Sequence, residues 1–172
     1  MADWRLRRAT VDDAPAAALV AGATFLQAFA GIMSGADIVA HVGRKCSVET
    51  FAAWAATPDT VVTLAEHPEG APLGYTVLVS PDLPIPTSRA DIELRRIYTL
   101  SHLHGTGLGP ALMARAVEDA RGMTKRRLLL GVFARNHRAR AFYEKQGFMV
   151  AGERKFLVGS SWFDDAIYAR EL

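Results

Sequence analysis

The segment His102–Met113, HLHGTGLGPALM, decides the fold class because it places three alternating glycines directly before a helical pattern. Gly105, Gly107 and Gly109 follow a strand pattern over Asp91–Leu100. A glycine turn between a strand and a helix presents free amides at the positive end of the helix dipole, and it lets a phosphate approach the main chain closely. The segment therefore predicts an anion-binding site at the start of a helix.

Two common phosphate-binding patterns do not fit this turn. A nucleotide P-loop requires Gly-x-x-x-x-Gly-Lys-Ser/Thr, and no Lys-Ser/Thr pair follows these glycines. The dinucleotide fingerprint requires Gly-x-Gly-x-x-Gly, normally after the first strand of the fold. Here the glycines alternate as Gly105-x-Gly107-x-Gly109, late in the chain. Neither nucleotide class is indicated.

A second motif lies downstream, in Asn136–Phe148, NHRARAFYEKQGF. On a helix, residues at i, i+3 and i+7 share a face, so Asn136, Ala139 and Tyr143 form one stripe. Phe142 is expected to turn toward the core. A small residue between two polar ones leaves room for a ligand to lie along the helix.

Both segments resemble motifs of the GCN5-related N-acetyltransferase (GNAT) family. His104–Gly109 is similar to the acyl-CoA turn Gln/Arg-x-x-Gly-x-Gly/Ala, with His104 in place of Gln or Arg. Asn136–Phe148 is similar to Asn-x-x-Ala-x-x-Phe/Leu-Tyr-x-x-x-Gly-Phe, and Ile92–Thr99 to the family's central strand. Over about residues 3–171 the chain also resembles PaiA-type spermidine/spermine N-acetyltransferases.

The resemblance implies an α/β (α+β) fold in a single domain over residues 1–172. It implies a mixed, mostly antiparallel sheet of six to seven strands with a V-shaped splay between two central strands, flanked by about four helices. Residue patterns predict strands near 4–9, 61–65, 74–79, 91–100, 128–133, 150–158 and 162–169. They predict helices ending near 29 and 56, and over about 107–121 and 136–146.

The resemblance also implies that acetyl-CoA lies in the splay. The amides of Ile97 and Thr99 would hold the pantetheine and the acetyl carbonyl, and the turn Gly105–Gly109 would bind the pyrophosphate. The remaining residues of the implied cofactor site are Tyr98, His104, Thr106, Leu108, Asn136 and Tyr143.

The chemistry implied is direct attack of a neutral amine on the thioester in a ternary complex. An alkylammonium group has a pKa of about 10.4, so the site needs a proton acceptor. We expect Glu93 in this role, because alternation along the strand places its side chain on the face of Ile97 and Thr99. Asp91 and then His102 are the alternatives. Tyr143 matches the family's general acid, because a phenol is still protonated at neutral pH.

The acceptor expected from the resemblance is a primary amine, with a polyamine favoured. Carboxylates and aromatic faces would suit a polyamine. Candidate suppliers are Phe25, Phe29, Trp162, Asp164 and Asp165. Alternatives are a protein amino terminus or lysine, an amino acid or an antibiotic, or a domain that binds acyl-CoA without turnover.

Composition excludes several other classes. A formal net charge of +2 gives no support for nucleic-acid or membrane binding, and the apolar stretch Ala14–Ala30 is interrupted by polar residues. The single cysteine, Cys46, excludes an internal disulfide and suits a cytoplasmic location. His102-x-His104 has no third ligand nearby, so no metal is expected. The family often pairs through C-terminal strands, which makes a homodimer an expectation.

Overall fold

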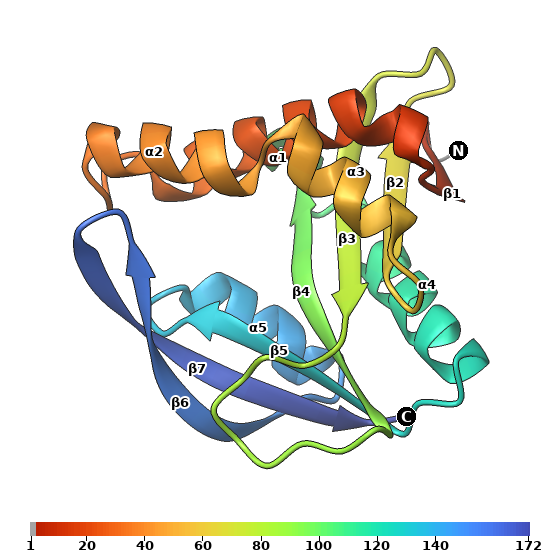
Figure 1. Cartoon of the computed structure of the whole chain (residues 1–172), viewed down its shortest axis with the longest axis vertical. Coiled ribbons are helices and arrows are strands. Elements are labelled where there is room, and N and C mark those ends of the chain that lie inside the picture. Colours follow the sequence, from red (N-terminus) through yellow and green to blue (C-terminus); the bar gives the residue numbers. More distant parts are fainter. Residues whose placement is uncertain (1–2) are drawn as a thin grey trace.

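The computed structural model describes residues 3–172 and is built around one seven-stranded sheet (Figure 1). The strand order is β1-β2-β3-β4-β5-β7-β6, and every neighbouring pair is antiparallel except β4–β5. The strands are β1 (Arg5–Arg8), β2 (Val61–Glu66), β3 (Pro72–Val79), β4 (Asp91–Thr99), β5 (Arg127–Phe133), β6 (Met149–Val158) and β7 (Ser161–Glu171). The expected mixed, mostly antiparallel sheet is confirmed.

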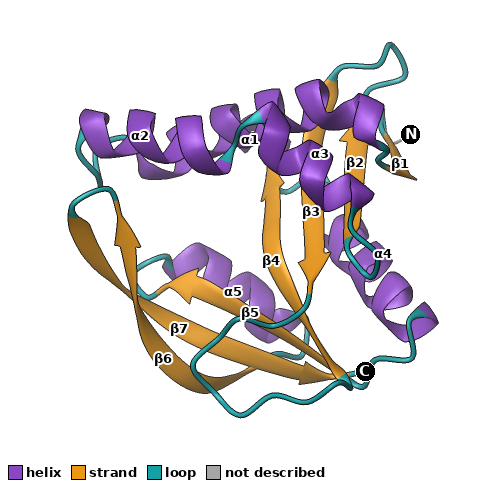
Figure 2. Cartoon of the chain, in the orientation of Figure 1, coloured by secondary structure: helices purple, strands orange, loops and turns teal. Residues whose placement is uncertain are grey.

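Helices cover both faces of this sheet (Figure 2). The helices are α1 (Ala14–Phe29), α2 (Gly35–Lys45), α3 (Val48–Ala56), α4 (Leu108–Gly122) and α5 (His137–Lys145), with short 3-10 turns at Val11–Asp13 and Ser101–Leu103. On one face, α1 and α3 pack against β2 and β3 around Phe25, Phe51 and Tyr75. On the other face, α4 and α5 enclose a second core with β5 and β7.

The two elements with the clearest sequence patterns form as predicted. Leu108, Leu112, Ala116 and Ala120 of α4 are all buried, which confirms the apolar stripe of this helix. Leu128–Leu130 of β5 are also buried, because β5 is covered by side chains on both of its faces. The glycine turn is thus held between two rigid elements.

The sequence reading expected about four helices and assigned none to Gly35–Lys45, where α2 lies. Gly35 and Gly43 lower the helix propensity of this stretch. A start signal was nevertheless present, because the Ser34 hydroxyl accepts a hydrogen bond from the Asp37 amide at 3.1 Å. The intrinsic propensity of this stretch makes α2 only marginally stable, and packing against α1 stabilises it.

A bulge in β4 changes which side chains share a face. Val77 of β3 pairs with Arg96, whereas the next residue, Leu78, pairs with Leu94, so Arg95 is the extra residue. Simple alternation had placed Glu93 on the face of Ile97 and Thr99. That prediction is wrong: beyond the bulge, the side chains that share Glu93's face are those of Arg96 and Tyr98, on the side of α1 and α3.

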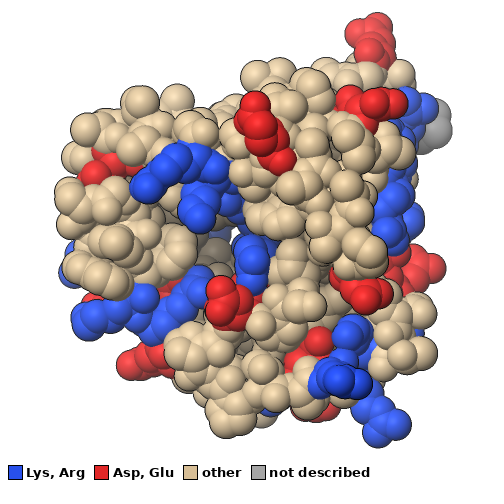
Figure 3. Space-filling view, viewed as in Figure 1, with Lys and Arg blue, Asp and Glu red and all other residues tan. Residues whose placement is uncertain are grey.

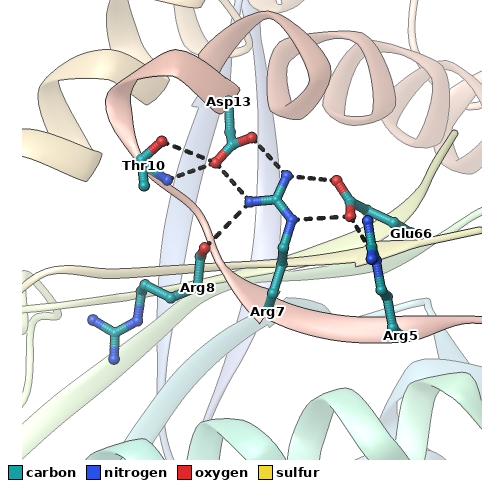
Figure 4. A network of polar contacts seen from close by, with 6 residues as sticks. All are labelled: Arg5, Arg7, Arg8, Thr10, Asp13 and Glu66. Atoms are coloured by element: carbon teal, nitrogen blue, oxygen red, sulfur yellow. Dashed lines mark hydrogen bonds and ion pairs between the residues drawn. The ribbon is translucent and has the colours of Figure 1, made fainter. Parts of the chain in front are cut away.

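The first strand is fixed to the rest of the fold by Arg7 (Figure 4). Its guanidinium donates to both carboxylate oxygens of Asp13, at 2.6 and 2.8 Å, and to both of Glu66, at 2.6 and 2.9 Å. Asp13 precedes α1 and Glu66 ends β2, so one side chain joins three elements. Two bidentate pairs on one guanidinium are a strong, orientation-specific contact.

We expect Arg7→Met to lower the free energy of unfolding by about 2–4 kcal/mol at pH 7, because it leaves Asp13 without a cation and Glu66 with only the longer contact to Arg5. Arg7 holds the pKa of both Asp13 and Glu66 below its usual range. Their contribution is therefore present above about pH 4 and is lost as the pH falls through the lowered folded-state values. Urea unfolding at pH 7 and pH 3 checks this, and the deficit of the variant should shrink at pH 3. Equal deficits at both pH values, or a similar loss in the exposed control Arg121→Met, would contradict the assignment.

Candidate functional site

The sheet opens between its two central strands. Within the described residues, β4 and β5 pair only through Asp91–Arg127, Ile92–Leu128 and Glu93–Leu129. Beyond these pairs β4 continues along β3 to Thr99, while β5 continues along β7 to Phe133. The two strands visibly diverge in Figure 1. Their far halves therefore border a wedge-shaped gap.

Two main-chain amides of β4 point into this gap. The Leu100 amide donates to the Leu73 carbonyl of β3 at 3.0 Å. Because amide direction alternates along a strand, the Tyr98 amide also points toward β3, and those of Ile97 and Thr99 point the opposite way. A backbone donor inside a protein needs a partner. The gap thus offers donors for a ligand's carbonyl or amide groups.

The glycine turn lies at the same end of β4. Gly105 and Gly107 have φ values of +84° and +96°, a region that favours glycine, and Gly107 directly precedes α4. A Cβ on either glycine would meet no atom within 4 Å, so the space in front of the turn is open. The Leu108 side chain is buried and anchors the helix start. The Thr106 hydroxyl donates to the Leu103 carbonyl at 2.7 Å, which steadies the turn.

Helix α5 forms the opposite wall. Asn136 caps it by accepting a hydrogen bond from the Ala139 amide at 3.1 Å. Tyr168 of β7 accepts from Arg140 at 2.9 Å and donates to Glu144 at 2.8 Å, which fixes the helix against the sheet. These contacts set the position of the next buried residue of the helix, Tyr143.

Tyr143 is buried, with its ring packed on Phe142, Phe148 and Tyr168. Phe142 had been expected to be the core residue of the pair, yet it is the more exposed one and its ring faces Gly109 of α4. Burial raises the pKa of Tyr143, so its phenol stays protonated at neutral pH. No side chain of residues 3–172 hydrogen-bonds with its hydroxyl, so the phenolic O–H has no side-chain partner.

Comparison with known proteins decides the family. The family model described as Acetyltransferase (GNAT) family matches residues 34–148, which is more than half of the chain. This chain belongs to the GNAT family. An uncharacterised N-acetyltransferase of Mycobacterium tuberculosis is 34% identical over 160 residues, which cover 93% of this chain and 98% of that protein.

Solved structures share the fold. A PaiA N-acetyltransferase from Thermoplasma acidophilum, solved in complex with coenzyme A, has a TM-score of 0.81 with 21% identity over 100% of both chains. A ribosomal-protein-alanine N-acetyltransferase from Brucella melitensis has a TM-score of 0.75 with 26% identity, covering 98% of this chain and 99% of that one. GNAT proteins bind CoA or acetyl-CoA, and the open gap with its free amides and glycine turn fits such a cofactor.

The GNAT turn has an arginine that the sequence reading missed. Where the family motif has Gln or Arg, this chain has His104, and Arg138 of α5 contacts its Nδ1 atom. A guanidinium can only donate, so this nitrogen accepts. The imidazole also hydrogen-bonds with the Thr99 backbone, and burial together with Arg138 lowers its pKa. His104 thus links β4 to α5, while Arg138 brings a cation beside the turn.

Both carboxylate candidates for the general base accept hydrogen bonds from an arginine. Glu93 is buried, and it accepts from Arg95 at 2.9 and 3.2 Å and from the Asp82 amide at 2.9 Å. Asp91 is held by Arg127 at 2.9 Å, below the point where the strands part. His102 is exposed in the 3-10 turn after β4. Of these three, Glu93 is the one at the apex of the gap.

Aromatic side chains line the side of the gap that faces α1. Phe25 stacks on His41 of α2 with ring centroids 4.1 Å apart. Phe29 then approaches Phe133 at 6.3 Å, and Phe133 packs on Phe163 of β7 at 5.6 Å. The sequence reading named Phe25 and Phe29 but missed the other three residues, because their proximity depends on strand pairing rather than on local spacing.

The three candidate acceptor-binding residues near the C-terminus differ in exposure. Trp162 is 64% exposed and Asp164 pairs with Lys155 on the surface, so neither belongs to this aromatic wall. Asp165 is buried and pairs with Arg154 at 3.1 Å. Within residues 3–172 no three His, Cys, Asp or Glu side chains gather as a metal site would require. No helix of the described chain has the length and apolar character to cross a membrane.

We expect Gly107→Ala to weaken acetyl-CoA binding about tenfold or more, because a Cβ at a φ of +96° costs on the order of 1–2 kcal/mol and would shift the turn. Gly122→Ala, at the other end of the same helix and next to open space, is the matched control. Titration calorimetry with acetyl-CoA measures both variants. Equal affinities for Gly107→Ala and the wild type would show that the turn does not hold the cofactor.

Proposed function

We propose that the protein transfers the acetyl group of acetyl-CoA to a primary amine by direct attack in a ternary complex. The observation that carries this proposal is the gap between β4 and β5, bordered by the free amides of Ile97 and Thr99 on one side and by Tyr143 on the other. A protein that only binds acyl-CoA would need the gap but not a protonated phenol beside it.

Acetyl-CoA supplies an activated acetyl group as a thioester. The amides of Ile97 and Thr99 would hold the pantetheine and polarise the acetyl carbonyl, as donors aimed at a developing oxyanion do. The amides of Gly105–Gly109, with Thr106 and Leu108 among them, would hold the pyrophosphate at the start of α4. Arg138 would add a charge-assisted contact that His104 alone does not give, and Tyr98 and Asn136 would border the cofactor.

Two protons have to be moved. The reacting nitrogen forms a bond to the acetyl carbon, and the carbon–sulfur bond breaks. Tyr143 would give its proton to the departing sulfur, because burial keeps the phenol protonated. Glu93 would take the proton from the amine through water, since both of its oxygens already accept hydrogen bonds from Arg95 or Asp82. The phenol is then restored from solvent.

The polyamine acceptor rests on the resemblance to PaiA-type enzymes, and a PaiA structure at 21% identity supports the fold alone. The single domain over residues 1–172, the homodimer and the cytoplasmic location likewise stay predictions. The first and last strands lie in the same sheet, which supports one domain, and the buried free thiol of Cys46 is compatible with a reducing compartment.

The proposal is tested by CoA-thiol release from acetyl-CoA with a panel of amines. We expect Tyr143→Phe to lower kcat about 10²-fold, the usual contribution of a positioned general acid. The dissociation constant for acetyl-CoA should stay unchanged, because the ring and its packing are kept. A variant with wild-type kcat would remove Tyr143 from the reaction. A protein that binds acetyl-CoA but releases thiol with none of the amines would favour the non-catalytic domain.

A further inference from the structure

Arg96 places a guanidinium beside the gap without an anionic partner. It follows the bulge in β4, and its side chain lies on the face of α1 and α3. One nitrogen lies 3.3 Å from the Cys46 sulfur, and the guanidinium carbon lies 5.2 Å from the Trp54 ring centroid. The Tyr75 hydroxyl also contacts it. These neighbours are neutral, and the side chain is still open in part to solvent.

Other arginines of the sheet are paired differently. Among the described residues, Arg7, Arg95, Arg127 and Arg154 each form an ion pair with an Asp or Glu, whereas Arg96 forms none. An arginine stays charged at any physiological pH. Its five N–H donors are only partly satisfied by a sulfur, a hydroxyl and a ring face. A charge enclosed in this way is costly unless an anion pairs with it.

The buried carboxylates nearest the gap cannot supply that anion. Glu93 is held by Arg95, and Asp165 is held by Arg154. The Arg154 guanidinium lies so close to Gly131 that an added Cβ there would approach it to 2.7 Å, so this pair is fixed against β5. Each acid therefore has its own cation, and Arg96 is left in excess.

Arg44 and Lys45 of α2 lie near Arg96 and His41 and add positive charge to this region. Burial, together with the charges of Arg96, Lys45 and Arg44, lowers the pKa of His41 to about 4. His41 is therefore neutral at pH 7.

Figure 3 shows Lys and Arg side chains, with acidic side chains between them, around a hollow bordered by α2, β4 and the β6–β7 hairpin. The Asp37 carboxylate, between α2 and the β6–β7 hairpin, accepts hydrogen bonds from Ser160 and Ser161, so it is already engaged. A polycation entering here would therefore meet cations, with Glu93 and Asp165 already paired.

Arg96 lies next to the reacting position. It directly precedes Ile97, whose amide points into the gap, so an anion held by Arg96 and an amine at the thioester fit within one small molecule. The neighbouring wall of Phe25, Phe29 and Phe133 is apolar. A planar guanidinium matches a carboxylate through two parallel hydrogen bonds.

We propose that the acceptor is a small amine that also carries a carboxylate, as an amino acid does, and that Arg96 binds this carboxylate. The inference rests on the proposed function, because it names the acceptor class of the same site. It disfavours a polyamine acceptor, because the positive charge of Arg96 would repel a polycation. An amine bearing a phosphate or phosphonate would present a similar oxyanion and is the second source to be distinguished.

The test uses pairs of amines that differ only in the anionic group: phenylalanine with phenethylamine, γ-aminobutyrate with propylamine, and phosphoethanolamine with ethanolamine, together with spermidine. With the wild-type protein, kcat/KM from CoA-thiol release should be about 10- to 100-fold higher for the carboxylate member of a pair, as for a charge-assisted contact. Arg96→Met should reduce this ratio to near one without changing the dissociation constant for acetyl-CoA. Arg96→Lys should keep part of it, since it retains the charge but loses the fork.

The exposed Arg121→Met is the control and should keep the wild-type ratio. Calorimetric binding of phenylalanine and phenethylamine to the CoA-loaded protein separates this inference from the proposed function. A binding preference for phenylalanine that Arg96→Met removes supports the inference even where no thiol is released, and in that case only the proposed catalysis fails. Spermidine preferred over every carboxylate amine, or a ratio unchanged in Arg96→Met, would overturn it. A preference confined to phosphoethanolamine would replace the carboxylate by a phosphate.

Discussion

The structure depends on a conflict between two strand pairings. β4 pairs with β3 from Glu93 to Thr99 and β5 pairs with β7, so the two central strands stay together for only three residue pairs. Beyond Glu93 the amides of Ile97 and Thr99 have lost the neighbouring strand that would pair with them. The proposed cofactor site is built from unsatisfied backbone rather than from a particular side chain, which is compatible with His104 in the family motif.

The bulge at Arg95 determines which side chains of β4 lie on each face of the sheet. It leaves Ile97 packed toward α4 and turns Arg96 and Tyr98 toward α1 and α3. On the first face lie the glycine turn and Arg138, which suit a phosphate-bearing cofactor. On the second lie the aromatic wall and the excess guanidinium, which suit an acceptor. One inserted residue therefore separates the proposed cofactor side from the proposed acceptor side.

Local patterns were sufficient for much of this structure and insufficient at identifiable places. The stripe of α4, the doubly covered β5 and the positive φ of Gly107 follow from periodicity and from what glycine alone tolerates. The bulge could not be read from the sequence, because Arg95 becomes an extra residue only against β3, so the face of Glu93 was assigned wrongly. The positions of Arg138 and Arg96 could not be predicted for a related reason. Each contacts a residue far away in the chain: Arg138 contacts His104, and Arg96 contacts Cys46.

The most direct test of the open sheet as the cofactor site is hydrogen–deuterium exchange, measured amide by amide by NMR with and without CoA. Amides paired within strands exchange slowly in either state, whereas those of Ile97, Thr99 and the turn Gly105–Gly109 should be slowed only when CoA is bound. Unchanged exchange at these positions would contradict the assignment. So would protection found instead around the cavity of about 350 Å³ that Pro86, Asp91 and Arg127 line at the other end of β4.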